Sequence, residues 1–262
     1  MARYPLALTT TAASAAASGQ PGGFPRRDAR PFLSCDALPG VQLPGQLIGI
    51  GENFWPGTAG GTAPDRRSRD RIPLVFGKFP GSLAAAGQDI VLDPDLSGTV
   101  VAEGELAVVI GRTLKDAANR DEALSAVAGV TVANDVSARD LQAADIQSTR
   151  GKSLDSFCPL GPDLVTLDEL PDVQDLRIIT RINDVAVQDA PTADMVFSVA
   201  ELVVFCSRFM TLYPGDIILT GTPFAADESG LELNPGDTVS VEIPGVGVLT
   251  NPVTSRPGRR HP

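Results

Sequence analysis

Histidine is almost absent from this sequence: the only one is His261, one residue before the end of the chain. This absence argues against Ser-His-Asp and Cys-His hydrolases, zinc sites with histidine ligands and histidine general bases. The three cysteines, Cys35, Cys158 and Cys206, form no close pair, so the sequence predicts neither a disulfide framework nor a zinc knuckle. We therefore expect a reduced, cytoplasmic setting.

Long apolar runs and basic residues are scarce as well. No run approaches the roughly 18 residues that a membrane helix needs, so no membrane span is expected. Lys and Arg total 21 against 32 Asp and Glu, which gives a net charge of −11. Such an acidic chain is a poor candidate for binding nucleic acid or anionic lipid. The 262 residues, 43% of them hydrophobic, are enough for one large domain or two small ones.

The chain has loop-like stretches and a strand-rich body. Residues 1 to about 30 are rich in Ala, Ser, Thr and Gly, which predicts a flexible or loosely docked N-terminus. Residues 56–73 are rich in Gly, Pro and charge, which predicts a mobile loop or lid. From Leu47 onward short apolar runs alternate with turn residues, without regular strand–helix alternation. The pattern predicts an α+β chain dominated by strands, and it disfavours a doubly wound sheet.

Local patterns predict individual elements of this body. Apolar runs and turn residues predict strands over 99–110 and 129–136 and a hairpin turn at Asn183-Asp184. Helices are predicted over three further segments: 121–127, closed by Gly129; 138–147, capped by Ser137; and 198–210, from the spacing of its apolar residues.

Two glutamates stand out in the apolar strand predicted over 99–110. The strand period of two places Glu103 and Glu105 on one face, roughly 6–7 Å apart, beside apolar neighbours. Burying two like charges is costly unless a cation or a proton neutralises them. The ordinary alternative is an edge strand whose glutamates face water.

A second group follows the next predicted strand. Asp135 ends that strand, where an ordinary turn or helix-cap role is the alternative. Arg139 and Gln142 are three residues apart on the following helix and share a face, so Asp135, Arg139 and Gln142 can converge on one point. Three carboxylates without His or Cys form a hard oxygen site, for which Mg²⁺, Mn²⁺ or Ca²⁺ is expected.

Three further residue types allow both a functional and an ordinary interpretation. The segment ending in Gly151-Lys152-Ser153 lacks the first glycine of a phosphate-binding loop, so that motif is rejected. Lys152 is then either a substrate-binding cation or a surface lysine. Thr222 follows a short strand, where its hydroxyl can hold a carboxylate or belong to an ordinary turn. Cys158 and Cys206 have no basic sequence neighbour that would activate a thiol, and are expected in the core.

Seven blocks of sequence resemble the fumarylacetoacetate hydrolase family, in the right order and over about Gly45 to Val253: AEGELAVVIG, GVTVANDVSARDLQ, GKSLDSFCPLGP, NDVAVQ, TADMVF, TLYPGDIILTGTP and GVGVLTNPV. The resemblance implies an α+β, β-rich mixed sandwich or roll of the fumarylacetoacetase C-terminal-domain type, usually dimeric. It divides the chain into an N-terminal segment (1–44), a catalytic domain (45–253) and a basic tail (254–262).

The resemblance also implies roles for the residues found above. Glu103, Glu105 and Asp135 match the metal ligands of the family, and Mg²⁺ is the expected ion, with Mn²⁺ or Ca²⁺ as alternatives. Arg139 and Lys152 match catalytic positions; substrate-binding positions are matched by Gln142, Thr222 and again Arg139. The expected substrate is a small anionic molecule, an acylpyruvate or a related 2-oxo or 1,3-dicarbonyl acid.

One part of the family pattern is missing. In the family that this chain resembles, hydrolytic members carry a histidine and a glutamate on a short lid helix after the motif GxN(Y/F). This pair activates water. Here the motif begins at Gly51, and Gly57 and Gly60 stand where the pair would fall. Three loop carboxylates are candidates for a base that replaces the pair: Glu52, Asp65 and Asp70. The alternative is that they are ordinary solvated loop residues.

The sequence thus predicts a metal-dependent enzyme that stabilises the enolate of a 2-oxo or 1,3-dicarbonyl acid. Family frequency favours C–C bond hydrolysis. The missing pair favours decarboxylation or keto–enol tautomerisation and isomerisation instead. A relative that binds metal or ligand without catalysis is the alternative from a different class.

Overall fold

The computed structural model describes residues 3–5, 7–10, 31–34, 45–55, 72–225 and 227–257. Most of the predicted N-terminal segment and most of the predicted lid lie outside these residues. The same is true of Cys35, His261 and four residues named for the lid: Gly57, Gly60, Asp65 and Asp70.

A mixed eight-stranded sheet forms the first layer of the fold, in the order β1-β12-β10-β9-β15-β4-β5, with β6 parallel to β12. Hydrophobic strand residues are buried on both faces of this sheet, which therefore forms the centre of the molecule. Its strands are β1 (Arg3–Pro5), β4 (Leu47–Gly51), β5 (Leu74–Lys78), β6 (Leu83–Ala85), β9 (Gly104–Ile110), β10 (Val127–Asn134), β12 (Cys158–Val165) and β15 (Ile217–Leu219).

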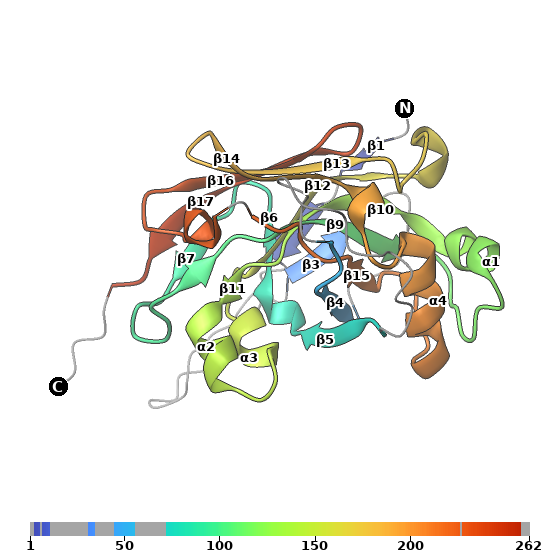
Figure 1. Cartoon of the computed structure of the whole chain (residues 1–262), viewed down its shortest axis with the longest axis horizontal. Helices are drawn as coiled ribbons and strands as arrows, with labels where there is room; N and C mark the ends of the chain where they lie inside the picture. The colour runs from blue at the N-terminus through green and yellow to red at the C-terminus, as the bar shows by residue number, and fades with distance from the viewer. Residues whose placement is uncertain are drawn as a thin grey trace, which may run out of the picture.

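A five-stranded sheet in the order β14-β13-β16-β17-β7 packs on one face of the first (Figure 1). Leu106 and Val108 of β9 meet Ile178 and Val241 of this sheet in the main core. The predicted β-rich α+β fold is confirmed. The strands of the second sheet and of two small pairs are β7 (Ile90–Leu92), β13 (Arg177–Ile182), β14 (Val185–Pro191), β16 (Thr238–Ile243) and β17 (Gly247–Ser255), β8 (Val100–Val101) with β11 (Ser137–Ala138), and β2 (Ala7–Thr10) with β3 (Pro31–Ser34).

Helices flank the sheets at two separate places. The longer helix α4 packs against α1 at one side, whereas α2 and α3 lie together beside β11 and β5 (Figure 1). The helices are α1 (Arg120–Ser125), α2 (Arg139–Ala144), α3 (Thr149–Lys152) and α4 (Val199–Phe209), and the 3-10 turns are η1 (Pro80–Ser82), η2 (Leu167–Glu169), η3 (Thr192–Asp194) and η4 (Glu228–Leu231).

The best-defined local signals are confirmed. Asn183 and Asp184 join β13 to β14 with φ values of 50° and 67°, as a tight hairpin turn requires. Ser198 caps α4, where its hydroxyl accepts from the backbone of Glu201 and the Glu201 carboxylate accepts from Ser198 in return.

Two predicted helix boundaries are wrong. Gly129 does not close α1, which already ends at Ser125; it lies inside β10, where a Cβ would come within 2.4 Å of the Val165 carbonyl oxygen. The small residue is therefore needed for strand packing. Ser137 does not cap α2, because its hydroxyl donates to the Asp135 carbonyl, and the predicted helix is interrupted after Ala144.

Candidate active site

An interruption between β8 and β9 positions the two glutamates. The predicted continuous strand over 99–110 is wrong, because the Ala102 N–H donates to the Leu231 carbonyl and leaves the ladder. Glu103 lies in this break, and Glu105 is the second residue of β9. The edge-strand alternative is also wrong, since β9 runs between β10 and β15 at the centre of the large sheet.

Asp135 completes the group from the neighbouring strand. It directly follows β10, and its N–H donates to the Glu103 carbonyl at 2.8 Å. It caps no helix, so the helix-cap alternative for this residue is wrong. One carboxylate oxygen from each of Glu103, Glu105 and Asp135 lies within 4.8 Å of the others, and the three residues are 3%, 1% and 0% exposed.

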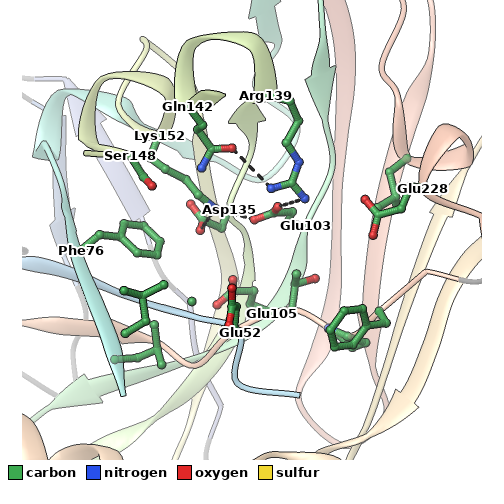
Figure 2. A pocket seen from close by; sticks show the side chains of 17 residues that line it. Glu52, Phe76, Glu103, Glu105, Asp135, Arg139, Gln142, Ser148, Lys152 and Glu228 are labelled. Carbon is green, nitrogen blue, oxygen red and sulfur yellow. Dashed lines mark hydrogen bonds and ion pairs between the residues drawn. The ribbon is translucent and has the colours of Figure 1, made fainter. Parts of the chain in front are cut away.

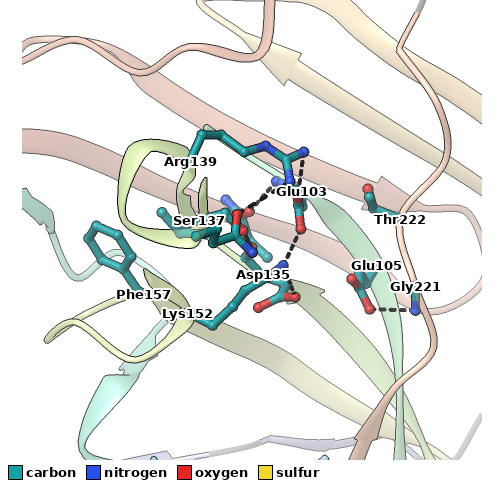
Figure 3. A network of polar contacts seen from close by, with 12 residues as sticks. Glu103, Glu105, Asp135, Ser137, Arg139, Lys152, Phe157, Gly221 and Thr222 are labelled. Atoms are coloured by element: carbon teal, nitrogen blue, oxygen red, sulfur yellow. Dashed lines mark hydrogen bonds and ion pairs between the residues drawn. The ribbon is translucent and has the colours of Figure 1, made fainter. Parts of the chain in front are cut away.

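Three cations surround two of these carboxylates. The Lys152 ammonium lies 2.5 Å from Oε2 of Glu103 and also pairs with Asp135, and Arg139 lies 2.6 Å from Oε1 of Glu103 (Figure 3). Lys78 lies 2.6 Å from Oδ1 of Asp135. The surface alternative for Lys152 is wrong, because the residue is only 5% exposed.

These contacts determine the protonation states of Asp135 and Lys152. Burial raises the pKa of Asp135, but the charges and hydrogen bonds of Lys152 and Lys78 outweigh it and hold that pKa below its ordinary value. Burial lowers the pKa of Lys152, but the charges of Asp135, Glu103 and Glu105 hold it above its ordinary value. The cluster is therefore ionised at Asp135 and Lys152.

Glu105 is the carboxylate with the least compensation. One oxygen accepts the Gly221 N–H at 2.7 Å, and no lysine or arginine of the described part of the chain forms an ion pair with it. Burial and the charge of Asp135 raise its pKa well above the ordinary value. A cation bound among the three carboxylates would supply the missing charge, so the donor set fits a divalent ion of the hard, oxygen-binding type.

The cluster lies in the wall of a cavity of about 270 Å³ (Figure 2). Arg139 and Gln142 project into it from α2, and Arg139 Nη1 donates to Gln142 Oε1 at 3.4 Å, so their predicted convergence is confirmed. The other polar and apolar residues that line it are Glu52, Ser148, Lys152, Thr222, Glu228, Ile50, Gly51, Leu74, Phe76, Pro223, Phe224 and Leu231.

Thr222 lies at this cavity, but its hydroxyl is already engaged. It donates to the Gly104 carbonyl at 3.0 Å and accepts from Gln188 Nε2 at 2.8 Å. Gln188 is 2% exposed and also donates to the Pro223 carbonyl. The buried amide thus fixes the segment after β15 against β9.

The sequence patterns do not predict three residues of the site. Lys78 ends a short apolar strand, and its partner Asp135 is 57 residues away, so no local pattern connects them. Gln188 looks like an ordinary strand residue. The Phe76 ring lies 4.9 Å from the Lys152 ammonium and lines the cavity. The one sequence feature that could have indicated any of these residues is the position of Lys78, a charged residue at the end of an apolar strand.

The two described cysteines are buried, as predicted. Burial raises the pKa of each thiol to about 12. Cys158 does have a basic neighbour in space, Lys78, whose charge lowers its pKa, but burial outweighs that charge. Neither thiol is activated.

Comparison with known proteins was made on both sequence and structure. The model of the family described as "Fumarylacetoacetate (FAA) hydrolase C-terminal" matches residues 48–254. The bovine mitochondrial oxaloacetate tautomerase FAHD2A is 41% identical over 218 residues, 81% of this chain and 68% of that protein. Human oxaloacetate tautomerase FAHD2B is 39% identical over 228 residues, 85% and 71% of the two chains.

Solved structures of similar proteins include isomerases and a hydrolase. A 5-carboxymethyl-2-hydroxymuconate delta-isomerase from Mycobacterium smegmatis superposes with a TM-score of 0.72 at 37% identity, over 82% of this chain and 78% of that one. A 2-hydroxyhepta-2,4-diene-1,7-dioate isomerase from Mycobacterium marinum superposes with a TM-score of 0.71 at 34% identity, over 87% of this chain and 88% of that one. A fumarylacetoacetate hydrolase from Exiguobacterium antarcticum superposes with a TM-score of 0.74 at 37% identity, over 82% of this chain and 76% of that one.

Among the residues that the structure describes, no helix is long and apolar enough to cross a membrane. The family match covers most of the chain, and the fold and the buried acidic cluster agree with it. This protein therefore belongs to the fumarylacetoacetate hydrolase family and is an enzyme of that superfamily.

Proposed function

We propose that this enzyme interconverts the keto and enol forms of a small 2-oxo acid such as oxaloacetate, with a divalent metal ion. The observation that carries the proposal is the buried cluster of Glu103, Glu105 and Asp135, whose oxygens lie within 4.8 Å of one another beside a cavity with cationic side chains. The relatives named as oxaloacetate tautomerases and isomerases support this reaction type.

The three carboxylates are the proposed ligands, and Mg²⁺ is the proposed ion, with Mn²⁺ or Ca²⁺ as alternatives. The burial of Glu105 near Asp135, which raises its pKa and which a bound cation would offset, supports this assignment. A bound divalent ion would polarise the keto oxygen of the substrate and favour the enolate. Lys152 remains beside Glu103 and Asp135 and adds positive charge where oxygen charge develops.

Arg139 and Gln142 are the proposed contacts of the substrate carboxylate. Both line the cavity, and the Arg139 side chain is 40% exposed although it also pairs with Glu103. The guanidinium therefore has donors directed to the cavity as well as to the cluster. Thr222 is proposed as a further carboxylate contact, for which its hydroxyl must exchange the Gly104 carbonyl for the substrate.

The expected C–C hydrolysis is the second candidate, supported by the similar fumarylacetoacetate hydrolase structure. The tautomerase and isomerase names of several relatives favour the other reaction over it. The non-catalytic alternative is wrong, because the chain is an enzyme of this superfamily. The cytoplasmic location and the homodimer stay predictions.

Substitution of the proposed ligands tests the assignment. Glu103→Ala and Asp135→Asn should abolish tautomerase turnover with Mg²⁺ and the Mg²⁺-dependent rise in melting temperature. Far-ultraviolet circular dichroism checks that each variant is folded. Glu105→Gln, which removes a charge without changing shape, should have the same effect. Turnover and metal binding at the wild-type level in these variants would contradict the proposed metal site.

A further inference from the structure

Keto–enol interconversion requires a proton to leave or join the carbon next to the keto group. The following inference rests on the proposed function and concerns the group that moves this proton. Glu103 and Asp135 are paired with Lys152, and Glu105 is directed to Gly221 and the other two carboxylates. In the described part of the chain, two more carboxylates line the cavity, Glu52 and Glu228.

Glu52 has an unusual backbone conformation for a residue other than glycine. Its φ is 52°, in the left-handed region, which is energetically unfavourable for a residue with a Cβ atom. The preceding residue ends β4, and the following residue, Asn53, is 1% exposed. Asn53 donates to the carbonyls of Phe197 and Thr220 at 3.1 and 2.7 Å. The conformation of Glu52 is therefore imposed from both sides.

The same turn lies next to the end of the cavity that contains Glu105. Gly221 donates to Glu105 at 2.7 Å, and a Cβ on Gly221 would lie 2.7 Å from the Cβ of Asn53. One glycine thus separates the Glu52 turn from Glu105. Glu52 and Glu105 lie toward one end of the cavity, and Arg139 and Gln142 toward the other (Figure 2).

This arrangement suits a proton transfer between two ends of a substrate. A substrate whose carboxylate is bound at Arg139 and Gln142 would extend across the cavity toward the end that contains Glu52 (Figure 2). Strained backbone conformations cluster at active sites and ligand-binding sites. Glycine would adopt the Glu52 conformation without that cost, yet a carboxylate stands there.

We propose that Glu52 is the catalytic residue that moves the proton at the carbon next to the keto group. In the keto-to-enol direction its carboxylate removes one proton, and the C–H electron pair becomes the carbon–carbon double bond. The carbonyl π pair moves onto the keto oxygen, which takes a proton from water, and Glu52 returns its proton to the resulting hydroxide. In the enol-to-keto direction Glu52 takes a proton from water and donates it to the carbon, the enol oxygen regains its carbonyl bond, and the enol O–H proton passes to the hydroxide.

Glu228 is the less suitable candidate. It belongs to η4 and lines the cavity at a place apart from Glu52 (Figure 2). Its turn meets the cluster through the backbone, where the Leu231 carbonyl accepts the Ala102 N–H one residue before Glu103, and Glu228 itself does not have a left-handed backbone conformation. Glu228→Gln is therefore the comparison variant at the same cavity.

The test compares full-length wild type with Glu52→Gln and Glu52→Gly, using oxaloacetate and Mg²⁺. Both variants should lose at least 100-fold in kcat for enol–keto conversion, with KM within about threefold, because general acid–base catalysis typically contributes 10²–10⁴-fold. Added formate should restore part of the kcat of Glu52→Gly, since it can occupy the space of the missing carboxylate. The Mg²⁺-induced rise in melting temperature should persist in both variants.

Asp184→Gly is the matched control for backbone strain. Asp184 has a φ of 67° in the β13–β14 turn, outside the lining of the cavity. Both glycine variants should melt no lower than the wild type, but only Glu52→Gly should lose kcat. A purely structural role for Glu52 would give the opposite: a lower melting temperature, loss of the Mg²⁺ effect and no rescue by formate.

The outcomes separate this proposal from the proposed function. Wild-type kcat in both Glu52 variants would overturn the assignment of Glu52 and leave the tautomerase function standing, with Asp65 or Asp70 as the next base to test. Loss of kcat in Glu228→Gln alone would also overturn it. Wild-type protein without tautomerase activity would overturn the proposed function and this inference together.

Discussion

The Nζ atom of Lys78 lies 2.6 Å from Oδ1 of Asp135, and the two side chains are 0% and 1% exposed. Lys78 also donates to the carbonyls of Phe157 and Val136 at 2.8 and 3.3 Å. The lysine at the end of β5 therefore fixes the position of a carboxylate that follows β10. The strands β5 and β10 are not neighbours in the sheet.

Lys78→Met should lower the free energy of unfolding of the metal-free protein by about 3–5 kcal/mol, because it leaves a buried charge with one partner fewer. Mg²⁺ should raise the melting temperature of this variant more than that of the wild type, since the ion would compensate Asp135. Denaturant unfolding with and without Mg²⁺ measures both effects. Arg177→Met, at an exposed ion pair with Asp189, is the control and should change little. Equal stability of Lys78→Met and wild type would contradict the buried pair.

Metal binding should depend on Glu105, a proposed ligand, but not on Glu228, a carboxylate that lines the same cavity outside the cluster. At a Mg²⁺ concentration of 100 times its Kd, the wild type should gain about 2.7 kcal/mol of stability. Glu105→Gln should lose most of this gain, although its metal-free form should be about as stable as the wild type, because the raised pKa of Glu105 favours its neutral form and Gln is neutral and of similar shape. Glu228→Gln should keep the gain. Isothermal titration with Mg²⁺ gives the two affinities, and an unchanged affinity in Glu105→Gln would contradict the assignment.

The buried thiols should be inert in the folded protein. Burial holds the pKa of Cys158 and Cys206 at about 12, so almost no thiolate is present at pH 8. A thiol reagent should therefore modify neither residue until denaturant is added. The experiment uses a Cys35→Ser background, because Cys35 lies outside the described residues. Rapid modification of two thiols under native conditions would show that the core is more open than described.

The N-terminus of α4 should contribute a pH-dependent part of the stability. Burial raises the pKa of Glu201, but hydrogen bonds from Ser198 and the charge of Arg120 outweigh it and hold the pKa below its ordinary value. A carboxylate with a lowered folded-state pKa stabilises the protein above its unfolded-state pKa, and this contribution is lost as the pH falls through the folded-state value.

Glu201→Gln isolates that charge, because Gln can keep the capping hydrogen bonds. The variant should melt below the wild type at pH 7, and the difference should vanish as the pH falls below about 4. Melting curves across this range check the effect. A difference that grows as the pH falls would have the wrong sign for a lowered pKa.

Sequence patterns predicted the fold class and most of the candidate site because the residues concerned carry local signals. The alternation around Glu103 and Glu105 and the helical spacing of Arg139 and Gln142 both depend on residues a few positions apart. The break before Gly104 was missed, because it results from a hydrogen bond between Ala102 and the distant Leu231.

Long-range contacts explain the other misses. Gly129 resembles a helix end in sequence, but a tertiary contact with Val165 requires its small size. Lys78 and Gln188 became recognisable only once the sheet had brought them to Asp135 and Thr222. Spacing alone cannot show which distant strand supplies the second partner of a buried polar group.

The most direct test of the central claim is to follow oxaloacetate and acetylpyruvate with the purified full-length enzyme, with and without Mg²⁺, recording both enol absorbance and products. The account predicts Mg²⁺-dependent conversion between enol and keto oxaloacetate without loss of carbon, and little or no cleavage of acetylpyruvate. Pyruvate plus acetate from acetylpyruvate, or pyruvate plus carbon dioxide from oxaloacetate, without faster enol–keto conversion would contradict it.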